Sequence, residues 1–296
     1  MDLRARPETR RLYFWFLVAV FIILALVRFL LFPAELSQST LKLTTGSILD
    51  GLLTAAATTI IAALGYWYFI LPAQRVDADH VHPSYLTKAL KLAADDATEW
   101  SLKARTAKYF TREILPIIAR NRASIRVRVQ LLDPGDQTLM RKYTEFRAAH
   151  PGAAAWNAVR VEREIFGSLL LIALYKKKFP ALDAEVRLSS SFWVLSIDCT
   201  GDSIFVCGQN KGDSALLYKR GQEYFDHYRE EFEAGYKTSR IIVPEISNYD
   251  LDDLRLPLTA QSRSAIKDMF AVMGFSLEDS EIEGAVQAAL GDHHYV

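Results

Sequence analysis

Long apolar runs with almost no charge occupy the first 75 residues. The run over residues 12–32, LYFWFLVAVFIILALVRFLLF, contains one charge, Arg28, and the run over residues 51–71, GLLTAAATTIIAALGYWYFIL, contains none. Each run has 21 residues, and because a helix rises about 1.5 Å per residue, each can cross a hydrocarbon core about 30 Å thick. The first run is too long for the core of a signal peptide, and no small-residue cleavage site follows it. The pattern predicts two transmembrane helices within residues 1–75.

The distribution of basic residues predicts the orientation of these helices. Four arginines precede the first run: Arg4, Arg6, Arg10 and Arg11. The connection over residues 33–50 contains one basic residue, Lys42. Because basic flanks stay in the cytoplasm, both termini are expected there, and Arg28 is expected to extend its guanidinium to the lipid headgroups.

The second apolar run carries a ridge of small residues that recur every fourth position. The ridge consists of Gly51, Ala55, Thr59 and Ala63. Small residues let transmembrane helices approach closely. Two interpretations stay open. The ridge packs against the first helix of the same chain, or copies of the second helix pack together with threonines along a polar path, namely Thr54, Thr58 and Thr59.

From residue 76 onward the chain reads as a globular α/β domain. Residues 124–132 alternate apolar and polar side chains, which predicts a strand. Further strands are expected over 184–190, 192–199, 203–207 and 214–218. Helices are expected over 84–100 (helical or mixed), 108–122 (kinked at Pro116), 138–149, 154–179, 223–235, 264–273 and 279–290. This order predicts an α/β domain over residues 76–249, followed by an acidic helical tail over residues 250–296.

Composition narrows the class of protein. Of 296 residues, 50 % are hydrophobic, only 14 are Gly and 10 are Pro, which excludes collagen and low-complexity or disordered chains. The two cysteines exclude a disulfide-rich secreted protein.

The 35 basic and 35 acidic residues balance in total but not locally. Residues 101–178 contain 16 Lys and Arg against 6 Asp and Glu, whereas residues 250–296 contain 3 against 9.

The basic block has two interpretations. It forms a solvated face attracted to anionic lipids, or it binds a phosphate-bearing ligand, because arginine side chains grip phosphate oxygens with paired N–H donors. The candidates for phosphate contact are Arg105, Lys108, Arg112, Arg126 and Arg128. The acidic tail is a candidate internal cover for such a site.

No common catalytic motif is present. The sequence lacks the phosphate-binding GxxxxGK[ST] loop, a GxGxxG turn after a strand and the zinc motif HExxH. Cys199 and Cys207 have no partnered histidine, and neither His150 nor His227 belongs to a recognisable nucleophile–base pair. We therefore expect no catalytic residues, no metal and no cofactor.

Residues 97–235 resemble the phospholipase D-like domains in the order of their elements and in one local pattern. In SSFWVLSIDCTGDSIFVCGQN, Asp198 takes the place of the family's aspartate, whereas Ser191 and Trp193 stand where active members carry the catalytic His and Lys. Gly208 begins a stretch similar to the family's Gly-Ser-x-Asn turn. The resemblance implies a degenerate active site without its nucleophile, lined by Ser191, Gln209, Asn210 and Lys211.

The whole layout is similar to that of membrane effectors of bacterial nucleotide-linked antiphage systems, the Hailong type among them. This likeness implies a bacterial inner-membrane protein that forms homo-oligomers and opens a pore or disrupts the membrane. The implied partners are a nucleotide or short oligonucleotide and a nucleotidyltransferase. Two alternatives stay open: a membrane-tethered phosphodiesterase or nuclease around His227 or Asp198, and a structural anchor that recruits a protein through the acidic tail.

Overall fold

The computed structural model of the chain describes residues 7–31, 40–65, 78–120, 124–149, 157–208 and 212–291. The chain divides into two compact units, Met1–Val76 and Asp77–Val296. The sequence places this boundary after residue 75.

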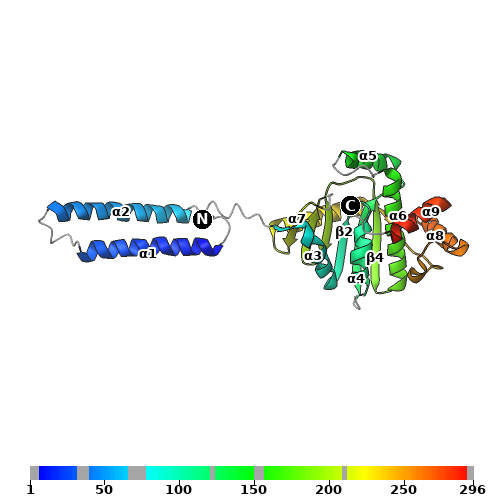
Figure 1. The fold of residues 1–296 in the computed structure, drawn as a ribbon, viewed down its shortest axis with the longest axis horizontal. Coiled ribbons are helices and arrows are strands. Elements are labelled where there is room, and N and C mark those ends of the chain that lie inside the picture. Colours follow the sequence, from blue (N-terminus) through cyan, green and yellow to red (C-terminus); the bar gives the residue numbers. More distant parts are fainter. Residues whose placement is uncertain are drawn as a thin grey trace. The chain divides into compact units, whose positions relative to one another are not determined.

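The first unit is a hairpin of two helices, α1 (Pro7–Leu31) and α2 (Thr40–Gly65) (Figure 1). Within α2, Gly46–Leu64 has 19 residues and a mean hydropathy of 1.7, and among the described residues it is the one stretch long and apolar enough to span a membrane. The apolar part of α1, Trp15–Leu30, is shorter. The expected second run ended at residue 71, and residues 66–71 lie outside the described residues.

An ion pair joins the two helices of the hairpin. Arg28 Nε donates to Asp50 Oδ1 at 2.7 Å, and a second guanidinium nitrogen donates to Asp50 Oδ2 at 3.2 Å. Arg28, which was expected to extend to the lipid headgroups, therefore has an acidic partner within the hairpin. Asp50 was assigned to the connection between the helices, but α2 begins ten residues before it, at Thr40. The carboxylate consequently lies within α2 and pairs with the cation of α1.

The second unit is built on one mixed sheet of eight strands in the order β1-β7-β6-β5-β2-β3-β4-β8. Strands β2, β3 and β4 run parallel, and the remaining pairs are antiparallel. The strands are β1 (Asp79–Val81), β2 (Glu99–Lys103), β3 (Ile125–Leu132), β4 (Leu182–Ser189), β5 (Ser196–Thr200), β6 (Ser203–Cys207), β7 (Ala215–Lys219) and β8 (Arg240–Ile242). The expectation of an α/β class is confirmed.

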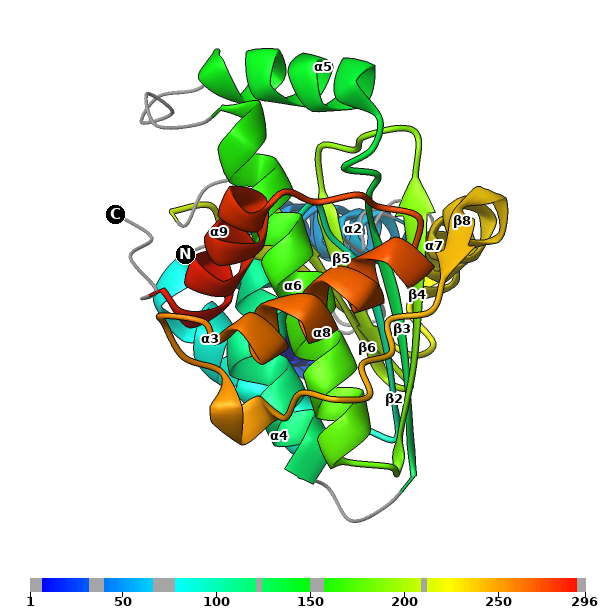
Figure 2. The same ribbon diagram turned by 90° about the vertical axis from the view of Figure 1, so that its right-hand side faces the viewer.

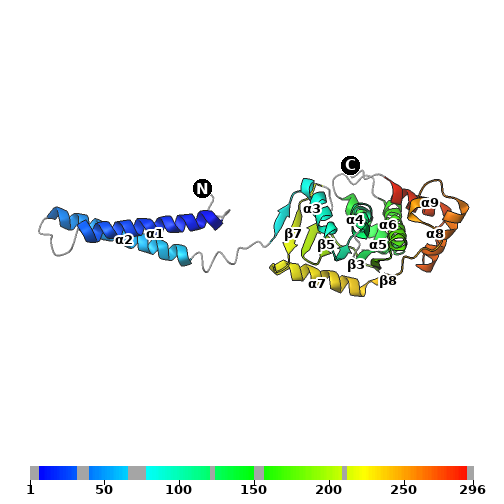
Figure 3. The same cartoon turned by 90° about the horizontal axis from the view of Figure 1, so that it is seen from below.

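Helices cover both faces of this sheet. Helix α7 lies on one face, and α3, α4 and α6 lie on the other (Figure 3). Helices α8 and α9 form an outer layer across α6 (Figure 2). The helices are α3 (Pro83–Asp95), η4 (Phe110–Ile114, a π-helix), α4 (Leu115–Arg120), α5 (Gln137–Ala148), α6 (Ala158–Lys178), α7 (Glu223–Thr238), η5 (Leu251–Asp253, a 3₁₀ turn), α8 (Ala260–Val272) and α9 (Asp279–Leu290).

The acidic C-terminal segment belongs to the same core as the sheet. Ile282, Ala285 and Val286 of α9 are fully buried within the cluster that α6 and the strands form. A Cβ atom at Gly167 of α6 would lie 2.8 Å from the Ala285 carbonyl oxygen, so this glycine permits the close approach of α9. Residues 250–291 are thus part of the second unit rather than a separate tail.

Candidate functional site

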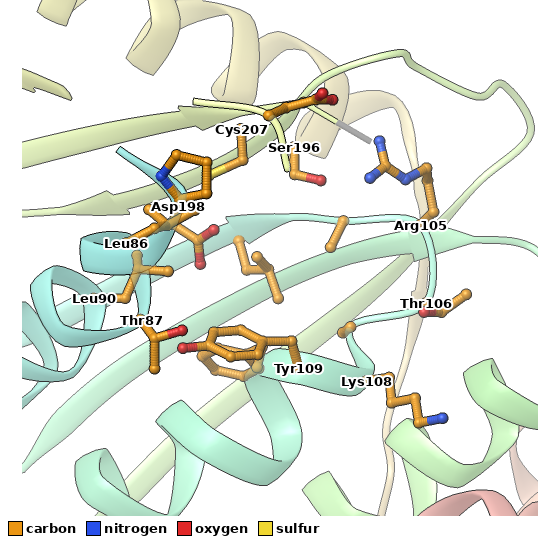
Figure 4. A pocket seen from close by; sticks show the side chains of 17 residues that line it. Leu86, Thr87, Leu90, Arg105, Thr106, Lys108, Tyr109, Ser196, Asp198 and Cys207 are labelled. Carbon is orange, nitrogen blue, oxygen red and sulfur yellow. The ribbon is translucent and has the colours of Figure 1, made fainter. Parts of the chain in front are cut away.

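A cavity of about 240 Å³ opens where the chain leaves β2. It lies between α3, the segment that follows β2, and the ends of β5 and β6 (Figure 4). Strand β2 pairs parallel with β3 on one side and antiparallel with β5 on the other. We call this cavity the Asp198 pocket. Its lining residues are Pro83, Leu86, Thr87, Leu90, Leu102, Ala104, Arg105, Thr106, Ala107, Lys108, Tyr109, Phe110, Ser196, Asp198, Cys207, Gly208 and Asp213.

Asp198 is the buried acid of this pocket. It pairs with Leu102 across the ladder between β5 and β2, and side chains alternate along a strand, so it faces away from α7. Asp198 is only 8 % exposed and accepts a hydrogen bond from Trp100 Nε1 at 3.2 Å. Burial raises the pKa of the Asp198 carboxyl to about 7, against the opposing effect of this hydrogen bond. No ion pair joins Asp198 to another described residue.

Two of the expected phosphate-contact residues line the same pocket. Arg105 donates from a guanidinium nitrogen to the Val194 carbonyl oxygen at 2.7 Å, which holds its side chain beside the loop that precedes β5. Lys108 Nζ lies 3.5 Å from Glu164 Oε1. Between them, Ala107 has a φ of +55°, a conformation that costs free energy for a residue with a Cβ atom. The chain after β2 is thus held in a strained turn that carries both cations, with Arg105 directed to the loop before β5 and Lys108 to α6.

Arg126 and Arg128 are not part of this pocket. Both lie on the face of β3 opposite to Val127 and Val129, which are buried in the core. Arg128 is held under α7 by Glu233 at 2.5 Å and by Ser101 Oγ at 3.2 Å. The prediction that Arg126 and Arg128 contact a phosphate together with Arg105 and Lys108 is therefore wrong, because alternation along β3 directs these two arginines to the other side of the sheet.

Arg112 also has a structural partner. One of its guanidinium nitrogens donates to the Ala288 carbonyl oxygen at 2.6 Å. This carbonyl lies in the last turn of α9, where the helix leaves its carbonyl groups without intrahelical partners. Arg112 therefore fastens α9 to η4 rather than facing the Asp198 pocket.

The residues expected from the phospholipase D-like pattern are only partly brought together. Ser191 lies in the loop between β4 and β5, with its Oγ 3.3 Å from Ser189 Oγ, and does not line the pocket. Trp193 receives Lys103 Nζ over its ring at 5.2 Å. Gly208 lines the pocket, whereas the neighbouring candidates Gln209, Asn210 and Lys211 lie outside the described residues.

Much of the basic surplus is neutralised within the chain. Three consecutive lysines at the end of α6 each pair with an acid of the segment that follows β8: Lys176 with Glu245, Lys177 with Asp250 and Lys178 with Asp252. No described residue beyond Asp213 lines the Asp198 pocket. The acidic segment thus pairs with the end of α6 and does not cover this pocket.

The described residues show no nucleophile–base arrangement. Burial raises the pKa of the Cys199 thiol to about 12 and raises that of Cys207 as well, so both thiols are protonated at neutral pH. His227 lies on α7, across the sheet from Asp198, and its ring packs edge-on against Tyr224. Among the described residues, no group of three or more His, Cys, Asp and Glu side chains could hold a metal ion.

The small-residue ridge of α2 does not face α1. Gly51, Ala55 and Thr59 are exposed and Ala63 is partly exposed, whereas Gly46 and Leu49 are buried in the hairpin. The threonine hydroxyls of this helix donate to carbonyl oxygens four residues earlier: Thr54 to Asp50 at 2.8 Å, Thr58 to Thr54 at 2.9 Å and Thr59 to Ala55 at 2.8 Å. The ridge therefore remains available to a partner outside the hairpin.

Sequence reasoning missed the wall that α3 contributes. Leu86, Thr87 and Leu90 lie on the side of α3 that faces the pocket (Figure 4). The hydrophobic spacing of Leu86 and Leu90 marks one face of a helix, but this signal does not show which strand the helix covers. Tyr109 and Ser196 also line the pocket and were missed, because no sequence pattern shows which elements pack together around it.

Comparison with known proteins does not identify a family for this chain. No protein-family model and no curated protein sequence matches this chain. One solved structure that matches is that of TrmBL2, an archaeal chromatin protein whose structure shows a novel mode of DNA binding. It is 12 % identical, 68 % of each chain is covered, and the TM-score is 0.33. At this TM-score the likeness carries no argument about fold or function.

Proposed function

We propose that this protein is a membrane effector of bacterial antiphage defence. Its two N-terminal helices cross the inner membrane with both chain termini in the cytoplasm. Its α/β unit binds a nucleotide or short oligonucleotide in the Asp198 pocket. A partner nucleotidyltransferase supplies this ligand. The ligand controls the assembly of α2 helices from several copies, and this assembly opens a pore or disrupts the membrane.

The observation that carries this proposal is the exposed ridge on α2. An apolar helix that packs only against α1 would bury its small residues there, because small residues allow the closest approach. Instead Gly51, Ala55 and Thr59 are exposed on a helix long enough to span a membrane. A second copy of the chain has the matching ridge, and homo-oligomers are the commonest assemblies.

The ion pair between Arg28 and Asp50 supports insertion of the hairpin. Isolated charges are costly within a bilayer, and such charges generally pair with one another. Pairing at 2.7 Å neutralises the one charge of the apolar part of α1. It also lets α1 and α2 enter the membrane as one unit.

The Asp198 pocket supports the sensor role. Arg105 lines a cavity whose walls are mostly apolar and that also holds the carboxyl groups of Asp198 and Asp213. This arrangement is suited to a ligand with an apolar part, hydrogen-bond donors and an anionic group. For such a ligand to act on the membrane helices, it must bind two states of the protein with different affinities. We further propose that the α/β unit is a phospholipase D-like domain in which Asp198 has kept its place and the catalytic His and Lys have been lost.

Assembly through the ridge is tested by cross-linking and by depolarisation. Ala55→Leu places a bulky side chain on the ridge and is expected to abolish both the oligomer in native membranes and depolarisation of expressing cells, followed with a potential-sensitive dye. Ile61→Phe adds bulk at another exposed position of α2 and should leave both unchanged. An intact oligomer in the Ala55→Leu variant would refute the role of the ridge.

Ligand binding is tested with two arginine variants. Arg105→Gln is expected to weaken the binding of a fluorescein-labelled oligonucleotide to the full-length protein in detergent, and to lower the salt dependence of binding by about one phosphate contact. Arg126→Gln, on the other face of the sheet, is the matched control and should bind like the wild type. Equal affinities of the two variants would show that the oligonucleotide does not bind in the Asp198 pocket.

A further inference from the structure

The carboxyl group of Asp198 has most of its hydrogen-bonding capacity unused. Its side chain is 8 % exposed, and Trp100 Nε1 is its one hydrogen-bond donor among the described residues. An ionised carboxylate offers about four acceptor positions, and a buried charge without partners costs free energy. The side chain points into the pocket (Figure 4). The pocket is therefore suited to a ligand group that carries N–H donors.

The walls around this carboxyl suit a flat apolar group. Leu86 and Leu90 of α3 and Leu102 of β2 line the pocket together with the ring of Tyr109. The cavity of about 240 Å³ lies below the range of roughly 300–1,000 Å³ typical of sites that enclose a whole drug-sized ligand. One planar heterocycle therefore enters, and the rest of the ligand stays at the mouth.

The residues at the mouth select the charge of that remaining part. Arg105 and Asp213 both line the pocket, whereas Lys108 is paired with Glu164 of α6. The guanidinium of Arg105 is a suitable contact for an anionic group such as a phosphate. A simple organic amine would also satisfy the Asp198 carboxylate, but it carries no phosphate for Arg105 to contact. A group that is itself neutral, carries N–H donors and is joined to a phosphate fits both ends of the pocket.

We infer that the Asp198 pocket reads the base of a nucleotide and takes a base with an exocyclic amino group, which donates to the Asp198 carboxylate while the adjoining phosphate contacts Arg105. This inference rests on the proposed function and specifies its ligand. Cytosine, adenine and guanine carry such an amino group. Thymine presents a carbonyl acceptor in the place of the amino donor of cytosine. Above pH 7 the Asp198 carboxyl is ionised, so two facing acceptors repel each other; the binding measurements are therefore made at pH 8.

The inference is tested with three trinucleotide probes of equal length, added to the full-length protein in detergent and followed by fluorescence anisotropy. The probes are fluorescein-labelled (dC)₃, (dT)₃ and an abasic trinucleotide with the same phosphates. The wild type is expected to bind (dC)₃ about tenfold more tightly than (dT)₃, the effect of about one well-placed hydrogen bond. The abasic probe should bind no better than (dT)₃, because it has no base to enter the pocket.

The variant Asp198→Asn should abolish this discrimination. Its amide keeps an acceptor for Trp100 and for cytosine and adds a donor for the thymine carbonyl, so the ratio of the two affinities should fall to about one. Asp202→Asn, at an exposed carboxylate, should keep the wild-type ratio. If Asp198→Asn does not fold, the three probes on the wild type still decide.

Three results separate the possible failures. Equal binding of (dC)₃ and (dT)₃ by the wild type would overturn the base-reading inference and leave the proposed function intact. Equal binding of (dC)₃ and the abasic probe would overturn it in the same way. Failure of all three probes to bind would overturn the proposed function as well.

Discussion

Replacing Asp198 by Asn removes the one buried carboxyl of the pocket that has no cation partner among the described residues. Burial raises the pKa of this carboxyl from 3.8 to about 7 in the folded protein. Between these two pH values the folded state holds a proton that the unfolded state has released. The free energy of unfolding of the wild type therefore falls as the pH rises.

The size of this effect follows from the two pKa values. Each unit of pKa difference corresponds to about 1.4 kcal/mol, so a rise from 3.8 to about 7 costs the folded state about 4 kcal/mol by pH 7. This part of the free energy of unfolding is fully present below pH 3.8 and is lost as the pH rises through about 7. Asn carries no titrating group, so the Asp198→Asn variant lacks this part of the pH dependence.

The assay is urea unfolding of the full-length protein in detergent between pH 4.5 and pH 8, followed by tryptophan fluorescence. We expect the stability of Asp198→Asn, relative to the wild type, to increase by about 1.4 kcal/mol for each pH unit until pH 7, and then to level off. Asp202→Asn should show a constant difference from the wild type, because that side chain is 87 % exposed. A constant difference for Asp198→Asn would refute the reasoning.

Three further predictions concern packing and charge. Asp50→Leu leaves Arg28 without its partner and should lower the amount of protein in the membrane fraction, whereas Asp50→Leu combined with Arg28→Leu should restore it; equal amounts for all three proteins would contradict the pairing. Gly167→Ala should lower the free energy of unfolding by about 1–3 kcal/mol, because its Cβ would meet the backbone of α9 at 2.8 Å, and Gly212→Ala, with open space around it, is the control. Arg126→Glu combined with Arg128→Glu should destabilise the protein, because Arg128 loses Glu233, while oligonucleotide affinity stays unchanged in the binding assay; a loss of affinity in the folded variant would place the site on the other face of the sheet.

Elements with a clear period could be predicted from the sequence. Strict alternation over residues 124–132 identified β3, and the helix expected over residues 279–290 is α9. Strand β2 was missed because four of its five residues are buried, so its sequence does not alternate. The strands β1 and β8 have three residues each, too few for a period to show.

The grouping of the site residues depended on tertiary packing. Arg105, Lys108 and Asp198 were each singled out in the sequence, but no local pattern joins residues that lie about ninety positions apart. Alternation over residues 124–132 correctly predicted a strand, and in a strand Arg126 and Arg128 lie on one face. It could not show that α7 covers this face and supplies Glu233 to Arg128. Likewise, the acidic composition of residues 250–296 concealed the buried apolar face of α9.

The central claim is that a ligand in the Asp198 pocket controls assembly of the membrane helices. The most direct test is the release of a dye from liposomes that contain the full-length protein, with and without (dC)₃. The account predicts that (dC)₃ changes the release by the wild type, that release by Arg105→Gln does not respond to (dC)₃, and that Ala55→Leu releases no dye with or without (dC)₃. Release that is identical with and without (dC)₃ in the wild type, or no release under any condition, would contradict it.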